Sequence, residues 1–91
     1  MAISIEHNRA AHRFETQVDG VQCVLDYTLA GTVMTLTHTG VPEAVGGRGI
    51  ASALVRAALE AARHESWTVI PECSYVAVWM QRHPDFDDLR A

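Results

Sequence analysis

The chain has 91 residues with a formal net charge of −4, and 48% of its residues are hydrophobic. This length suits one domain with a single core, which we expect to span residues 1–91. The acidic balance argues against a surface for the nucleic acid backbone, and the absence of lysine excludes P-loop and Schiff-base chemistry.

We also expect no targeting or membrane segment. No stretch is long enough to span a bilayer, and the N-terminus lacks the charged-then-apolar order of a signal peptide. We therefore expect a cytoplasmic protein with no membrane or nucleic acid partner. A disulfide between Cys23 and Cys73 is not expected in that compartment.

Alternation of apolar and polar residues predicts antiparallel strands in the first half of the chain. A short run at Ile3–Ile5 predicts an edge strand. Residues 13–18 alternate cleanly, and Asp19-Gly20 then gives a strong signal for a two-residue hairpin turn before a second run over 21–29. A third run covers residues 32–39. The result is a meander, with an apolar face formed by Phe14, Thr16, Val18, Val21, Cys23, Leu25, Tyr27 and Leu29.

A glycine-rich segment comes next and leads into a helix. Three glycines fall within residues 46–49, although each costs about 0.5–1 kcal/mol relative to alanine near a helix. Strong helix formers follow, so we expect the helix to begin near Arg48 with several free backbone N–H groups. Such groups favour a bound anion, whereas the plainer alternative is a flexible turn that caps the helix. The apolar stripe expected to pack on the sheet is Ile50, Leu54, Val55, Ala58, Leu59 and Ala62.

The last third of the chain predicts a strand, a helix and a tail. Residues 67–70 form a strand parallel to the one before the glycine segment, with its pairing ended by Pro71. Ser74–His83 forms a second helix that His83-Pro84 closes, and residues 85–91 form an acidic tail. The expected fold class is α+β, with a mixed, mostly antiparallel sheet in which a meander precedes helix, strand and helix.

Two side chains are candidates for chemistry. Cys73 precedes the expected helix cap Ser74, and a helix N-terminus lowers the pKa of a thiol, although a lone cysteine also serves as a small core residue. His38 ends a strand beside the expected anion site and is suited to accept a proton, or to hold a structural hydrogen bond. The histidines at positions 7, 12 and 64 show no ligand spacing, so we expect no metal site.

The element order resembles the Gcn5-related N-acetyltransferase core. The acetyl-CoA loop of that superfamily carries Arg or Gln, two variable residues, Gly, one variable residue, then Gly or Ala. The segment Gly46-Gly47-Arg48-Gly49-Ile50-Ala51 matches the last two fixed positions and has glycine at the first. The chain also resembles the small single-domain subgroup of the superfamily, through His38-Thr39, Val41-Pro42, Pro71-Glu72-Cys73 and Arg82-His83-Pro84.

This resemblance implies a set of binding and catalytic residues. Acetyl-CoA is the implied co-substrate, with its pyrophosphate on the amides of residues 47–51 and its pantetheine arm paired to the strand end near Thr39 and Val41. Gly46 lacks the side chain that usually adds a pyrophosphate contact. Cys73 lies beside the thioester, and His38 or a water serves as the base. The cofactor-binding set is Thr39, Val41, Gly46, Gly47, Arg48, Gly49, Ile50 and Ala51.

The activity implied is transfer of acetyl to an amine on a polypeptide, a polyamine or a small molecule. Cys73 either protonates the departing CoA thiolate or is itself acetylated first. A CoA or acyl-CoA binding module without turnover is one alternative, and a protein interaction domain is another. Edge strands in so small a sheet are compatible with either a monomer or a homodimer.

Overall fold

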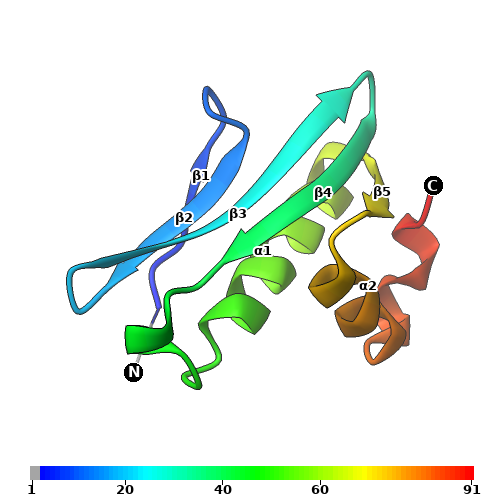
Figure 1. Cartoon of the computed structure of the whole chain (residues 1–91). Helices are drawn as coiled ribbons and strands as arrows, with labels where there is room; N and C mark the ends of the chain where they lie inside the picture. The colour runs from blue at the N-terminus through cyan, green and yellow to red at the C-terminus, as the bar shows by residue number, and fades with distance from the viewer. Residues whose placement is uncertain (1–2) are drawn as a thin grey trace.

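A five-stranded sheet in the order β1-β2-β3-β4-β5 organises the computed structural model, which describes residues 3–91 (Figure 1). The first four strands pair antiparallel, and β5 pairs parallel to β4. This topology confirms the α+β class and the mixed, mostly antiparallel sheet. The strands are β1 (Glu6–Asn8), β2 (Arg13–Val18), β3 (Val21–Ala30), β4 (Val33–Gly40) and β5 (Thr68–Pro71).

The hairpin turn between β2 and β3 forms where the sequence predicts it. Val18 pairs with Val21, and Asp19 and Gly20 between them have φ of 52° and 76°. Two left-handed residues give the hairpin turn whose twist matches that of the strands, and Asp and Gly both tolerate this conformation.

The first strand is displaced from its expected position. The prediction of an edge strand at Ile3–Ile5 is wrong, because β1 begins at Glu6. The carbonyl of Ser4 accepts a hydrogen bond from the Thr16 hydroxyl at 2.7 Å, and Ile3 and Ile5 pack against the core. This bond gives a partner to the hydroxyl of Thr16, which the sequence predicts on the otherwise apolar face. Residues 1 and 2 of the expected domain lie outside the described residues.

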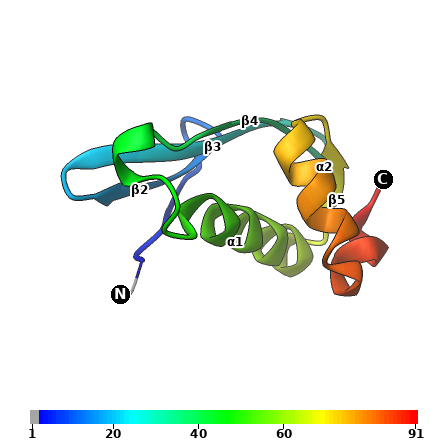
Figure 2. The same cartoon turned by 60° about the horizontal axis from the view of Figure 1, so that its bottom comes forward.

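Helix α1 (Ile50–Glu65) lies beneath one face of the sheet, as Figure 2 shows. Every residue of its predicted stripe is buried, with at most 1% of each side chain exposed. The helix begins two residues later than expected from Arg48, because Gly49 has φ of 76° and cannot belong to a right-handed helix. The short 3₁₀ helix η1 (Glu43–Val45) precedes the glycine segment.

The C-terminal third differs from expectation at its end. Helix α2 (Ser74–Gln81) stops two residues before His83, whose ring stacks on Trp79 with centroids 3.6 Å apart. The expectation that residues 85–91 form a tail is wrong, because η2 (Pro84–Leu89) is a 3₁₀ helix that buries Phe86 and Leu89. Residues three apart share one face of a 3₁₀ helix, so both apolar side chains reach the core. Among residues 3–91, no helix combines the length and apolar character needed to cross a bilayer.

Candidate active site

Strand β5 is short and ends part-way along β4 (Figure 1). Their pairing runs from Val33 opposite Thr68 to Leu36 opposite Pro71, and the Cys73 amide then donates to the Leu36 carbonyl at 2.9 Å. Pairing therefore continues past Pro71, where it was expected to stop. Beyond Leu36, the described chain provides no strand on this edge of β4. The edge leaves backbone groups open to an extended ligand.

A β-bulge interrupts β4 beside this open edge. Tyr27 pairs with Leu36, whereas the preceding Asp26 pairs with His38, so Thr37 is the extra residue. A bulge shifts the alternation of side chains by one residue. Thr39, paired with the fully buried Leu25, therefore lies on the same face of the sheet as α1.

Thr39 and Cys73 meet at this point. The hydroxyl oxygen of Thr39 lies 3.5 Å from the half-buried Sγ of Cys73. Cys73 is itself the N-cap of α2, so the expected cap at Ser74 is wrong by one residue. Cys73 caps the helix with an extended backbone, with φ of −67° and ψ of 127°.

The environment favours the thiolate of Cys73. Burial alone raises the pKa of this thiol. The hydrogen bond from the Thr39 hydroxyl and those from nearby backbone groups lower the pKa, and together they outweigh burial. Those groups belong to Val76 and Tyr75 in the first turn of α2 and to Thr39. The pKa of Cys73 consequently lies below its ordinary value, as expected for a thiol at a helix N-terminus.

The imidazole of His38 lies on the opposite face of the sheet. His38 is exposed and pairs with Asp26, which accepts a hydrogen bond from Nε of Arg13 at 2.7 Å. A Cβ added to Gly40 would lie 3.2 Å from Nε2 of His38, so the imidazole covers this glycine. The structure therefore does not bring His38 and Cys73 to one side of the sheet, although both flank the open edge.

The glycine segment lines a cavity of about 320 Å³. Most of the expected cofactor-binding residues line it, and two further residues, Ser52 and Tyr75, were missed. Tyr75 follows Cys73 by two positions with 41% of its side chain exposed, and an exposed aromatic in the first turn of a helix was the available signal. The lining residues are Val41, Gly46, Gly47, Gly49, Ile50, Ala51, Ser52 and Tyr75.

Backbone donors beside this cavity are free. In residues 3–91, none of the amides from Gly47 through Ser52 donates to a backbone acceptor, and the first α1 bond runs from Ala53 to Gly49. A Cβ at Gly47 or Gly49 would find no atom within 4 Å. Consecutive free N–H groups at the positive end of a helix dipole suit an anion such as a phosphate.

Two contacts connect the walls of the site to the rest of the molecule. The indole N–H of Trp79 on α2 donates to the Ser52 hydroxyl on α1 at 2.8 Å, which joins the N-terminal turn of α1 to α2. The Arg48 guanidinium lies 2.6 Å from the Asp19 carboxylate in the β2–β3 turn, and Arg48 is not among the residues that line the cavity.

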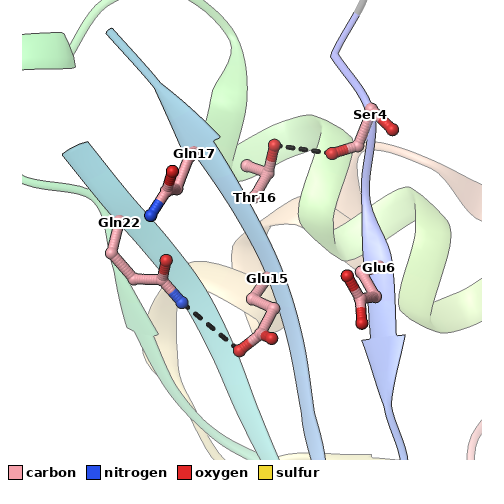
Figure 3. A pocket seen from close by; sticks show the side chains of 6 residues that line it. All are labelled: Ser4, Glu6, Glu15, Thr16, Gln17 and Gln22. Atoms are coloured by element: carbon pink, nitrogen blue, oxygen red, sulfur yellow. Dashed lines mark hydrogen bonds between the residues drawn. The ribbon is translucent and has the colours of Figure 1, made fainter. Parts of the chain in front are cut away.

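A second hollow of about 330 Å³ lies beside β1 and β2 and is polar (Figure 3). Glu6 pairs with Glu15, Glu15 with Val24, and Val24 with Gly40. The two carboxylates that line the hollow therefore lie in the same cross-strand row as the end of β4. No group of three or more His, Cys, Asp or Glu side chains within the described residues is arranged to hold a metal ion.

Comparison with known proteins identifies the family. A family model described as GCN5-related N-acetyl-transferase matches residues 13–89. The chain belongs to the GCN5-related N-acetyltransferase family. The resemblance found in the sequence is thus confirmed, and acetyl-CoA is the acetyl donor that this family generally uses.

Relatives of known sequence and structure agree with this assignment. Protein NATD1 of Gallus gallus is 34% identical over 85 residues, which cover 90% of this chain and 77% of NATD1. NATD1 of Homo sapiens is also 34% identical over 85 residues, covering 90% and 75%. The solution structure of a GCN5-like protein from Staphylococcus aureus superposes with a TM-score of 0.76 at 22% identity, covering 97% of this chain and 87% of that protein. It shows the same fold.

Proposed function

We propose that this GCN5-related domain transfers acetyl from acetyl-CoA to an amine. The observation that carries the proposal is the run of free amides from Gly47 to Ser52, which border a cavity at the end of β4. Six adjacent N–H donors without a backbone acceptor are available to a ligand, and a diphosphate matches them in charge and hydrogen-bonding capacity.

The open edge of β4 suits the rest of the cofactor. A pantetheine arm carries two amides in an extended chain, so it pairs best with backbone groups that no strand uses. In this proposal, the segment from Thr39 to Val41 binds the arm, while residues 47–51 bind the pyrophosphate. Gly46 gives the loop room but no side-chain contact. The thioester then lies near Cys73.

Direct transfer needs one base, one acid and a donor to the oxyanion. His38, or a water beside it, takes a proton from the amine, whose nitrogen then attacks the thioester carbonyl. A backbone N–H between Thr39 and Val41 donates to the oxygen as it gains charge. The C–N bond forms and the C–S bond breaks. The Cys73 thiol, whose pKa is lowered, gives its proton to the departing CoA thiolate.

The same thiol supports a two-step route. The Cys73 thiolate attacks the thioester and releases CoA thiolate, and the amine then displaces the acetyl group from sulfur. We favour direct transfer because the superfamily generally works that way, while the position of Cys73 beside Thr39 keeps the two-step route open.

A cationic acceptor fits the outer face of the sheet. The carboxylates of Glu6 and Glu15 lie in the cross-strand row that ends at Gly40, whereas Asp26, opposite His38, is already paired with Arg13. The two glutamates favour a polyamine or a lysine-containing polypeptide over a neutral amine through electrostatic attraction.

Calorimetric titration with acetyl-CoA and with CoA tests the proposal, followed by intact mass measurement and an assay for acetylated amines. Micromolar binding with turnover of a polyamine or peptide is the expected result. Binding without turnover of any amine would favour a CoA-binding module. No binding of either ligand would leave a protein interaction domain. A stable gain of one acetyl group that requires Cys73 would favour the two-step route.

A further inference from the structure

The glycine segment is fixed at its ends and has few contacts in its middle. Val45 and Ile50 are 2% and 1% exposed and anchor the two ends in the core. The four residues between them are all exposed, and Gly47 and Gly49 have φ of 77° and 76°. Glycine has the most backbone freedom to lose on ordering, so this segment should be costly to hold in one conformation.

Arg48 provides the tertiary contact in the middle of the segment. Its Nη1 donates to Oδ2 of Asp19 at 2.6 Å, across 29 positions of sequence. Asp19 is itself held in place, because it lies in the two-residue turn closed by the Val18–Val21 pair. The ion pair therefore ties the glycine segment to the β2–β3 turn.

We infer that Asp19 is a positioning residue for the cofactor: its ion pair with Arg48 holds the glycine segment in the conformation whose amides bind phosphate. This inference rests on the proposed function. Arg48 lies between the two left-handed glycines, so fixing its side chain restrains both neighbouring backbones. The guanidinium acts through that backbone, since Arg48 does not line the cavity.

The test breaks the pair from either side and measures the Kd for CoA. Asp19→Asn suits the turn, because asparagine tolerates the left-handed conformation. Exposed ion pairs contribute modestly, so Asp19→Asn and Arg48→Gln should each weaken CoA binding about two- to fivefold. The double variant should be no weaker than the worse single variant, and Arg48→Lys should retain most of the affinity.

A matched control is available in the Arg63–Asp88 pair. It has an N–O distance of 2.7 Å and similar side-chain exposure, 46% and 61% against 40% and 63% for Arg48 and Asp19. Asp88→Asn removes an equivalent charge away from the loop and should leave the Kd for CoA unchanged. A loss of affinity in both variants would overturn the inference, because it would mean that breaking an ion pair away from the loop weakens binding equally. Net charge cannot cause such a loss, since removal of a carboxylate favours the anionic CoA.

A second readout needs no ligand. The {1H}-15N nuclear Overhauser effects of Gly47 and Gly49 in the free protein should fall in Asp19→Asn, with those of Gly31 unchanged. If wild type binds no CoA, the proposed function fails and this readout still decides whether the pair orders the loop. Unchanged loop dynamics would overturn the inference. So would tighter CoA binding by Asp19→Asn, which would mean that Asp19 withholds Arg48 from the phosphates.

Discussion

Helix α1 and the glycine segment that precedes it experience opposite constraints. Along its length, Leu54, Ala58, Leu59 and Ala62 are fully buried against the sheet, and their contribution is packing. Before its first turn, residues 46–49 are exposed, and two of them adopt a left-handed conformation. The first region should govern stability and the second ligand binding. Substitutions can therefore separate the two effects.

The largest effect should come from the packed region. Leu59→Ala removes a fully buried side chain and should lower the free energy of unfolding by about 2–5 kcal/mol, as measured by urea denaturation. The neighbouring exposed Glu60 is the control, since Glu60→Ala should change it by less than about 0.5 kcal/mol. A cost for Leu59→Ala no greater than that of the control would mean that α1 does not pack as described.

Cys73→Ser should separate turnover from binding at the open edge. Loss of an acid or nucleophile typically reduces rate by at least about 10²-fold, so kcat should fall by that factor, while calorimetry should find CoA affinity within about twofold of wild type. Cys23→Ala is the matched control, because Cys23 is buried on β3 and should alter stability but not kcat of the folded protein. Full turnover by Cys73→Ser would remove Cys73 from the mechanism.

Two glycines with similar backbones test the loop itself. Gly49 and Gly31 have φ of 76° and 61°, and an added Cβ meets no atom within 4 Å at either. Alanine at either position should cost about 1–2 kcal/mol of stability through the left-handed backbone. Thermal unfolding and CoA titration should then find equal destabilisation but weaker CoA binding only for Gly49→Ala. Equal CoA affinity in the two variants would count against the loop as the phosphate site.

The smallest effect concerns the pH dependence of stability and involves His7 on β1. Burial lowers the pKa of His7, with Arg9 and His12 adding to the effect and Glu65 opposing it, and Nε2 of His7 lies 2.6 Å from the Tyr27 hydroxyl. The unfolded chain binds the proton more tightly, so stability is complete above about pH 6.5 and falls as pH drops toward the folded pKa.

His7→Gln should flatten this part of the stability curve, as followed by urea denaturation between pH 7.5 and 5. His64→Gln, which changes an exposed histidine, should leave the curve unchanged. A steeper loss of stability toward acid in His7→Gln would contradict the assignment.

The sequence predicts the fold where one periodicity extends over many residues. The alternation in β2 and β3 and the stripe of α1 each repeat often enough to fix which face is buried. The 3₁₀ helix at residues 84–89 was missed because Phe86 and Leu89 are two apolar residues among aspartates, too few for a period to show.

The candidate site was only partly predictable for a related reason. The glycine segment is unusual in composition, so it could be found without a structure. The bulge at Thr37 could not, because a bulge depends on the register between two strands, and it determines which side of the sheet Thr39 and His38 face. The Asp19–Arg48 pair likewise depends on how the β2–β3 turn lies beside the loop.

The most direct test of the central claim is an NMR titration of the 15N-labelled protein with acetyl-CoA. We predict the largest amide shifts from Gly47 to Ser52 and from Thr39 to Val41, with little change at Gly31 or along the buried face of α1. Absence of shifts in the glycine segment, or shifts concentrated at Glu6 and Glu15 in the polar hollow, would contradict the account.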